Sequence, residues 1–475
     1  MSSAIVVGSG PNGLAAAVRL ARAGLDVTVL EASGEIGGGT RSSEMLVPGL
    51  LHDHCSAVHP LAAGSPFFDG LDPALGGLTW LQPQVDCAHP LDNGSAGAFY
   101  RSMDRTVEGL GRDGERWRRV FEPMASHFDA LFADASQPVL RVPRHPLTLA
   151  RFGVAAMLPA TTLAWKWRTE EAKALWAGVA AHAFSRLDRP MTSAVGLMLI
   201  VAGHAKGWVV AEGGSRAIAT ALASDLLRNG GTIETGVRVT SAADLPPSDV
   251  LMLDVSPSIA ADILGDRLPG RVARSYRRFR HGPGAFKVDY AIEGDVPWTA
   301  EAPRGAGTVH LGGSLDEVVA TEEAVCRGRM PDRPFVLVGQ QYLADPSRSV
   351  GNIHPLWTYA HVPNGYTGDA TEAITAQIER FAPGFREQII ATEARSATEM
   401  SAYNANYIGG DVIGGASSLK QLVFRPRFAI DPYFTGIPGT YLCSASTPPG
   451  AGAHGMCGAN AAARALARLG MGSVR

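Results

Sequence analysis

The chain has few cysteines and no closely spaced pair of them. Its five cysteines are Cys55, Cys87, Cys326, Cys443 and Cys457. The absence of a CxxC motif argues against a redox-active dithiol. An odd number of cysteines without paired spacing is typical of reduced thiols, so we expect a cytoplasmic protein.

Metal-ligand spacing, long apolar runs and an excess of charge are also missing. His52, His54 and His59 lie close together in the sequence, but histidines in a loop beside a cofactor are commoner than ligands, and we expect no metal. The longest apolar run, residues 194–203, is too short to cross a bilayer. Because the formal net charge is only -3, we expect no nucleic-acid partner.

The strongest signal that is present lies in residues 4–31, AIVVGSGPNGLAAAVRLARAGLDVTVLE. An apolar strand, a glycine-rich turn, an alanine-rich helix and a second strand follow one another, as in the unit that binds a dinucleotide. Gly8 permits the tight turn, Gly10 lets the backbone approach a pyrophosphate, and Gly13 lets the helix pack closely on the strand. Glu31 ends the second strand, where a carboxylate accepts hydrogen bonds from ribose hydroxyls.

Two further glycine-rich segments favour a longer cofactor than a nicotinamide dinucleotide. Residues 37–42, GGGTRS, combine bare backbone with a guanidinium, and together these can clamp a diphosphate. Near the C-terminus a strand at 439–443 leads into PPGAGAHGMCGAN and a helix over 461–469. A helix N-terminus after such a turn suits a phosphate or a polar ring. No separate nicotinamide motif is visible, so we expect no NAD(P)H reductase activity.

These motifs resemble those of the FAD-dependent phytoene desaturase-like oxidoreductases, which belong with the flavin amine oxidases. The resemblance rests on VVGSGPNGL, VLEA and GGGTRS at one end and on YLCSAST and GANAA at the other. Segments 282–298 (GPGAFKVDYAIEGDVPW) and 409–427 (GGDVIGGASSLKQLVFRPR) extend it through nearly the whole chain, towards the branch of pyridine nucleotide-disulfide oxidoreductase domain-containing protein 2. The C-terminal motif departs from the family pattern at Ser444, Pro448 and His454.

The resemblance implies an FAD cofactor and a set of residues that hold it. Val237 would place its backbone against the adenine. The implied cofactor-binding residues are Gly8, Gly10, Pro11, Asn12, Gly13, Glu31, Ala32, Gly38, Gly39, Thr40, Arg41, Val237, Ser446, Gly455 and Met456.

The resemblance also implies an α/β fold of the glutathione-reductase type, with a discontinuous FAD-binding Rossmann domain. We assign residues 1–70, 206–269 and 430–475 to that domain. Residues 71–205 and 270–429 form an α+β substrate domain, in which alternating residues at 286–290 and 335–338 predict an antiparallel sheet.

Two side chains are candidates for catalysis. Lys287 precedes Pro297 and Trp298 at a spacing similar to that of the flavin amine oxidases, in which a strand lysine holds a water near the flavin. Alternatively, Lys287 extends to solvent on the strand face that it shares with Asp289. His454 could donate a hydrogen bond to the flavin or substrate, or it could pack beside the last helix.

The neighbouring segment SAYNANYIGGD suggests that Tyr403, Asn404 and Asn406 line the cavity. For residues 147–165, nearly uncharged but interrupted by Pro159, we favour a buried or cleft-lining helix pair; a surface that contacts a membrane or accepts a greasy substrate is the alternative.

The leading functional hypothesis is a dehydrogenase, desaturase or oxidase that takes a hydride from a small lipophilic molecule, such as an isoprenoid or other secondary metabolite. A redox-neutral FAD-dependent isomerase, an amine oxidase and a non-catalytic flavoprotein are the alternatives. The sequence specifies neither the substrate, nor the electron acceptor, nor the oligomeric state.

Overall fold

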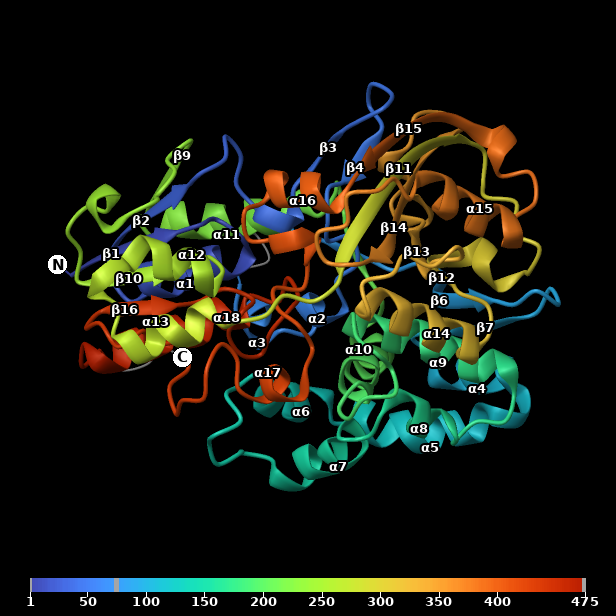
Figure 1. Cartoon of the computed structure of the whole chain (residues 1–475), viewed down its shortest axis with the longest axis horizontal. Helices are drawn as coiled ribbons and strands as arrows, with labels where there is room; N and C mark the ends of the chain where they lie inside the picture. Colours follow the sequence, from blue (N-terminus) through green and yellow to red (C-terminus); the bar gives the residue numbers. More distant parts are fainter. Residues whose placement is uncertain (1, 72–76, 472–475) are drawn as a thin grey trace.

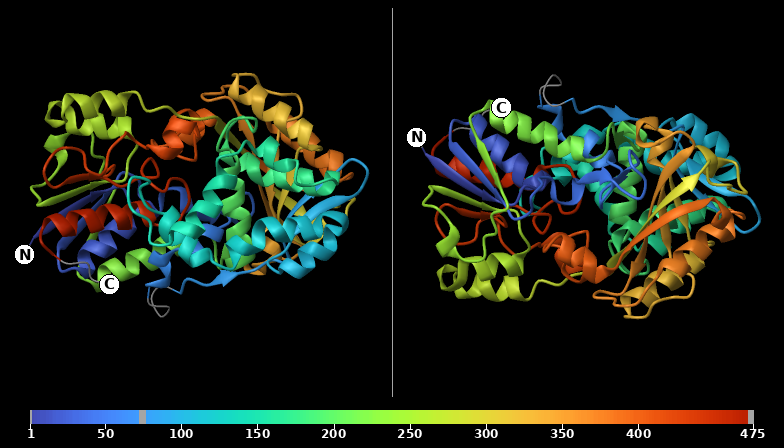
Figure 2. Two further views of the ribbon diagram at one scale, coloured as in Figure 1. Left: turned by 90° about the horizontal axis from the view of Figure 1, so that it is seen from below. Right: turned by 90° about the horizontal axis from the view of Figure 1, so that it is seen from above.

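The computed structural model describes residues 2–71 and 77–471. Residues 1, 72–76 and 472–475, which fall within the predicted domain ranges, lie outside the described residues. Two β-sheets organise this part of the chain, one at each end of the molecule, and a layer of helices lies beside the second sheet (Figures 1 and 2).

The first sheet is entirely parallel and has the strand order β16-β10-β1-β2-β9. Its strands are β1 (Ser3–Val7), β2 (Asp26–Glu31), β9 (Thr232–Thr235), β10 (Val250–Leu253) and β16 (Thr440–Leu442). The central strands are continuously apolar because helices cover both of their faces. Three stretches of chain that are far apart in sequence therefore meet in one sheet.

Helices pack on both sides of this sheet. On one side lie α1 (Pro11–Arg22), α11 (Arg216–Arg228) and α18 (Met456–Arg468), with α1 between the other two. The crossing of α1 and α18 is close, because a Cβ atom at Gly458 would overlap the carbonyl oxygen of Asn12. On the other side lie α12 (Pro257–Leu264) and α13 (Gly270–Arg277).

The second sheet has seven strands in the order β15-β11-β14-β13-β12-β6-β7. Their bounds are β6 (Val85–Pro90), β7 (Ala96–Phe99), β11 (Gly284–Glu293), β12 (Ala306–Leu311), β13 (Val336–Gly339), β14 (Ile353–Val362) and β15 (Ile389–Arg395). The prediction of antiparallel strands at 286–290 and 335–338 is confirmed, because β11 and β13 are antiparallel to their neighbours. The sheet as a whole is mixed, because β12 and β6 pair in parallel. No hairpin turn links these two strands, which come from distant stretches of the chain, so nothing forces them to run in opposite directions.

The helical layer comes from the stretch between β7 and β8 (Val210–Ala211). It comprises α4 (Met103–Gly109), α5 (Gly114–Ala125), α6 (Phe128–Ala135), α7 (Pro146–Ala156), α8 (Ala160–Ala164), α9 (Glu170–Ala180) and α10 (Ser193–Lys206). Their shared core contains the buried indoles of Trp117, Trp167, Trp176 and Trp208. This core fixes the helices beside the seven-stranded sheet, and the sheet in turn carries Lys287.

Shorter elements and peripheral helices complete the described structure. They are β3 (Ser42–Glu44), β4 (Leu51–Asp53), β5 (Trp80–Leu81), α2 (Pro60–Ala63), α3 (Pro66–Asp69), α14 (Leu315–Cys326), α15 (Thr371–Phe381), α16 (Ala397–Tyr403) and α17 (Leu419–Val423). In the described part of the chain, every helix is too short or too polar to span a bilayer.

The segment 147–165 differs from its favoured interpretation. It does form a helix pair, α7 and α8, and Pro159 is the residue that precedes α8. However, Leu147 and Trp165 are 86% and 81% exposed, so the pair is only partly buried. Apolar side chains lie on two opposite sides of α7, and the core of the helical layer covers one of these sides.

Candidate cofactor site

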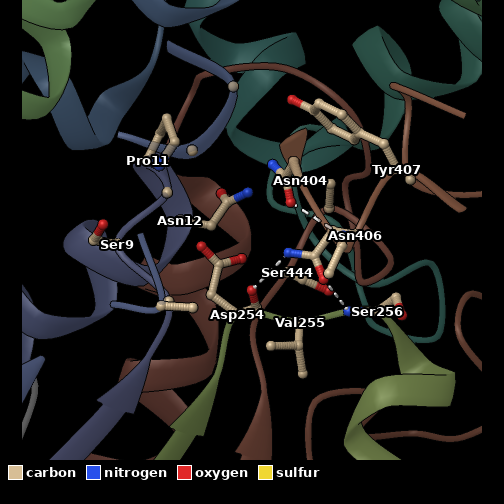
Figure 3. Close-up of a pocket in the computed structure, with 18 of the residues that line it drawn as sticks. Ser9, Pro11, Asn12, Asp254, Val255, Ser256, Asn404, Asn406, Tyr407 and Ser444 are labelled. Atoms are coloured by element: carbon tan, nitrogen blue, oxygen red, sulfur yellow. Dashed lines mark hydrogen bonds between the residues drawn. The ribbon is translucent and has the colours of Figure 1, made fainter. Parts of the chain in front are cut away.

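A cavity of about 430 Å³ opens at the carboxyl ends of β1, β2 and β10. This edge of an open parallel sheet is where ligands commonly bind. Figure 3 shows how loops from several stretches of the chain converge there. The wall is made by residues 7–12, 30–33, 38–41, 55–56, 237–239, 254–256, 402–407, 444–446 and 451–453, together with Ile259, Val412 and Gly414.

The two predicted N-terminal glycine clusters lie against each other in this wall. A Cβ atom at Gly38 would approach the Cα atom of Gly10 to 3.2 Å. Gly8 has a φ of +100°, which the tight turn after β1 requires. A Cβ atom at Gly13 would overlap the carbonyl oxygen of Gly8. Both clusters therefore present bare backbone to the cavity, as the close approach of a diphosphate demands.

Glu31 is buried at the end of β2 and its carboxylate lies in the cavity wall. One carboxylate oxygen accepts hydrogen bonds from the Ser9 N–H at 2.9 Å and the Ser9 hydroxyl at 2.6 Å. The other accepts from the Ser33 N–H at 2.8 Å and lies 3.3 Å from an Arg41 nitrogen. The two backbone donors and the side chains of Ser9 and Arg41 fix the carboxylate at the end of β2. The residue therefore fits the ribose-binding role predicted for it.

Arg41 provides a cation in the same wall. Its Nε atom donates to the carbonyl of Glu35 at 3.1 Å, and its guanidinium lies 5.3 Å from the ring centre of Tyr403. Burial to 7% exposure and these contacts fix a positive charge beside the two glycine clusters. This arrangement suits the predicted contact with a diphosphate.

Val237 lines the cavity, but its backbone N–H is already engaged and cannot donate to an adenine. The Val237 N–H donates to the carbonyl of Glu31 at 2.8 Å. A contact with adenine would therefore be made by the carbonyl oxygen of Val237.

Asp254 is a wall residue that the sequence reasoning missed. It follows β10, is 8% exposed, and accepts a hydrogen bond from the Gly13 N–H at 2.9 Å. Burial, helped by the nearby charge of Glu31, raises the pKa of Asp254 to about 7, although the hydrogen bond from Gly13 acts in the opposite direction. Its position directly after a buried parallel strand was the available signal, since such strand ends host ligands.

Asn406 ties the far wall to the residues that follow β10. Its side-chain oxygen accepts from the Ser256 N–H at 2.9 Å, and its amide donates to the Asp254 carbonyl at 3.2 Å (Figure 3). The expectation that Tyr403, Asn404 and Asn406 line the cavity is confirmed.

Most of the predicted cofactor residues line the cavity, and three do not. Those in the wall are Gly8, Gly10, Pro11, Asn12, Glu31, Ala32, Gly38, Gly39, Thr40, Arg41, Val237 and Ser446. Gly13, Gly455 and Met456 are not among the lining residues. Gly455 precedes α18 with a φ of +69° and packs against Phe67, while Met456 is the first residue of that helix.

Lys287 lies beside the cavity and not in its lining. Its ammonium forms an ion pair with Asp289, and both side chains are almost fully buried, which excludes the alternative that Lys287 extends to solvent. Burial lowers the pKa of Lys287, and the attraction of Asp289 opposes this effect. Lys287 is close enough to lower the pKa of the cavity-lining Cys55, although burial raises that thiol's pKa overall. A catalytic role for Lys287 stays a prediction.

His454 is buried in the turn before α18, and the turn residues Ala451, Gly452 and Ala453 line the cavity in its place. Its Nδ1 atom accepts the Met456 N–H at 3.1 Å, and its carbonyl accepts from Ser65. Burial lowers the pKa of His454 to about 4, so the imidazole is neutral near pH 7. These contacts match the alternative interpretation, in which His454 orders the start of the helix; contact with flavin or substrate stays a prediction.

The polar groups of the cavity wall match successive parts of a dinucleotide. A fixed carboxylate stands where a ribose is expected, and paired glycine segments with a guanidinium stand where a diphosphate is expected. Among the described residues, no cluster of three histidine, cysteine or acidic side chains is arranged to hold a metal ion.

Comparisons with known proteins agree with this site. Residues 6–69 match the NAD(P)-binding Rossmann-like domain family. Mouse pyridine nucleotide-disulfide oxidoreductase domain-containing protein 2 is 24% identical, over 97% of this chain and 92% of the relative. Hydroxyneurosporene desaturase of Cereibacter sphaeroides is 25% identical, over 98% of this chain and 97% of the relative.

A solved structure of cyclohexylamine oxidase from Brevibacterium oxydans shares the fold, with a TM-score of 0.58 and 16% identity over 99% of both chains. The chain is therefore similar, over nearly its full length, to a desaturase and to a further oxidoreductase domain-containing protein, and it shares the fold of an amine oxidase. Together with the dinucleotide cavity, these similarities support an FAD-dependent oxidoreductase.

Proposed function

We propose that this FAD-dependent oxidoreductase removes a hydride from a C–H bond of a lipophilic substrate and so introduces a double bond. The similarity to hydroxyneurosporene desaturase, which extends over almost the full length of both chains, supports a hydrophobic substrate of the isoprenoid type. Bound FAD supplies the chemistry, because its isoalloxazine ring accepts the hydride.

The observation that carries the proposal is the pairing of charge beside the cavity. Lys287 and Asp289 neutralise each other within a buried pair, and Asp289 also lies 3.3 Å from His52. A charged substrate would need an uncompensated partner there, because an unpaired charge is costly to bury. A hydrocarbon needs none.

The residues of the chain then have three tasks in the proposed reaction. Glu31, Arg41 and the glycine segments hold the cofactor. The buried Tyr407 and the half-buried Cys55, both in the cavity wall, limit the access of water to the reacting bond. A proton must also leave the carbon next to the one that loses the hydride. Because Asp289 holds Lys287 as an ammonium, which cannot accept that proton, Lys287 would position a water molecule that takes it up.

The aromatic residues of the cavity wall support amine oxidation less well than the proposed desaturation. Tyr403 and Tyr407 both belong to the segment 402–407 and both contact the turn at Gly38 and Gly39. They pack on the cofactor turn from one side and do not come from two separate walls. The likeness to cyclohexylamine oxidase concerns the fold alone.

Anaerobic bleaching of the flavin tests the proposal. The purified holoenzyme is mixed with isoprenoid polyenes, with primary and secondary amines, and with alcohols, and the loss of flavin absorbance is followed. We expect bleaching by a polyene, with a product lighter by two hydrogen atoms. A product of unchanged mass would establish the isomerase instead, and bleaching by amines alone would overturn the proposal.

A further inference from the structure

Helix α7 is apolar on two opposite faces, and only one of them is covered. Leu149, Phe152 and Ala155 pack against the core of the helical layer. On the other face, Leu147 and Val154 are one heptad apart and are 86% and 74% exposed. A helix that is apolar all round is typically buried or in contact with a second apolar phase.

The exposed apolar side chains of the protein gather around this helix. Of fourteen large exposed hydrophobic residues in the described structure, seven lie within 139–165 and three more within 419–430. The two segments adjoin, because Pro138, Val139 and Leu140 share a small crevice with Val423, Phe424 and Ala429. We call these ten residues the apolar edge: Val139, Leu140, Val142, Leu147, Val154, Met157, Trp165, Leu419, Phe428 and Ile430.

Scattered exposed hydrophobic residues are ordinary, but a concentration of this kind marks an interaction surface. Helices α6, α7 and α17 lie near one another at one margin of the molecule in Figure 1, and α8 lies along the same margin. Trp165 follows α8 and is 81% exposed. An exposed indole is favoured where a hydrocarbon phase meets water.

The segment that carries seven of the ten residues of the apolar edge contains charges of a single sign. Residues 135–169 contain no aspartate or glutamate but include Arg141, Arg144, Arg151, Lys166 and Arg168. Of these cations, Arg141 alone pairs with a carboxylate of the described residues, that of Asp134. Arg144 and Arg151 are exposed beside the apolar face of α7. This positive stretch belongs to a chain whose formal net charge is -3.

We propose that the apolar edge docks on an anionic lipid surface, with Leu147, Val154 and Trp165 inserted among the acyl chains and the arginines at the headgroups. A second copy of the chain would bring the same positive charge to the contact and be repelled. An anionic bilayer satisfies both features, since amphipathic surface segments bind by apolar burial together with attraction to acidic lipids. The proposal does not depend on which substrate the flavin oxidises.

Co-flotation of the holoprotein with vesicles tests the proposal. Vesicles of phosphatidylcholine with phosphatidylglycerol should carry the protein at low salt, and vesicles of phosphatidylcholine alone should carry much less. The double variant Leu147→Ser, Val154→Ser should lower partitioning by about tenfold or more, because two exposed apolar side chains no longer insert. Arg144→Gln with Arg151→Gln should remove about tenfold from anionic vesicles only.

The matched control is Leu227→Ser with Ile390→Ser, which removes two exposed apolar residues far from α7 in the sequence and outside the apolar edge. Retained FAD absorbance shows that each variant is folded. The proposal fails if the wild-type protein does not float with anionic vesicles, or if the control variant loses as much binding. It also fails if the protein is a dimer that Leu147→Ser with Val154→Ser dissociates, because the edge then serves a second copy.

Discussion

The carboxylate of Asp254 lies 2.9 Å from the backbone nitrogen of Gly13 and accepts its hydrogen bond. The carboxylate of Asp254 thus lies at the N-terminus of α1, where the helix dipole would otherwise favour a bound anion from solution. A Cβ atom at Gly10 would come within 2.8 Å of the same Asp254 oxygen, so the carboxyl group also lies directly against the glycine turn. Phosphate groups that bind at the N-terminus of α1, as the glycine motif predicts, would lie close to Asp254.

Asp254→Asn should tighten FAD binding above pH 7. The amide keeps an oxygen that can accept the Gly13 N–H but removes a negative charge that competes with the diphosphate. Burial and Glu31 raise the pKa of Asp254 to about 7, so the wild-type carboxyl is largely neutral at pH 6 and ionised at pH 8. The Kd for FAD, measured by fluorescence quenching, should therefore rise with pH in the wild type and much less in the variant.

The same substitution should change the stability of the apoprotein in a defined pH window. The folded pKa of Asp254 is raised above the unfolded value of 3.8, so the folded state retains a proton that the unfolded state loses. The contribution of Asp254 to stability therefore falls as pH rises from about 4 to about 7. Asp254→Asn removes this fall, and chemical denaturation of both apoproteins at pH 4.5 and pH 8 measures it. The groups that share its surroundings are Glu31, Cys443 and Cys457.

Glu31→Gln should weaken FAD binding by about tenfold, because a neutral amide accepts weaker hydrogen bonds from a ribose than a carboxylate does. Glu35→Gln is the matched control, since Glu35 is exposed in the following turn and outside the cavity wall. Equal FAD affinities of the two variants would remove Glu31 from the cofactor site.

Gly39→Ala should lower FAD occupancy through contact with a single side chain. The added Cβ atom would overlap the Tyr407 hydroxyl, and Tyr407 is buried in the cavity wall. Adding Tyr407→Phe removes that oxygen and should restore much of the lost affinity. Flavin content per protein, measured for both single variants and the double variant, checks the rescue. A double variant no better than Gly39→Ala would mean that the alanine acts on the cofactor directly.

Lys287→Met should leave FAD bound but slow flavin reduction or its reoxidation. It also leaves Asp289 buried without its partner, which costs about 3 kcal/mol of stability. The double variant Lys287→Met, Asp289→Asn removes both charges and should recover most of the stability. Stopped-flow rates of the two half-reactions separate the effects. Wild-type rates in the double variant would assign Lys287 to structure alone.

The parts of the fold that local sequence could predict are those with strong periodicity. The glycine turn and the strands around it were predictable because Gly8 and Gly13 have no substitute in that geometry. The parallel pairing of β12 with β6 was not, because strand partners that are distant in sequence leave no local mark. For residues 147–165 the sequence left a buried helix pair and an exposed apolar surface as alternatives, since an apolar segment has the same pattern whether protein or another phase covers it.

The candidate site shows the same contrast between residues in local motifs and residues that only the fold brings together. Residues 8–13, 31 and 38–41 were found because they occur in contiguous motifs, and all of them except Gly13 reach the cavity wall. Asp254 and Cys55 were missed because only the folded chain brings them to the same cavity. His454 shows the limit of motif transfer: its place in the turn was right, but its ring faces the Met456 N–H.

The close crossing of α1 and α18 has a consequence for how the polypeptide matures. The first helix of the cofactor unit receives its partner only after α18 has been synthesised, because Gly458 packs directly on Asn12. Until then the N-terminal strands lack one covering layer, so cofactor capture should follow the synthesis of α18.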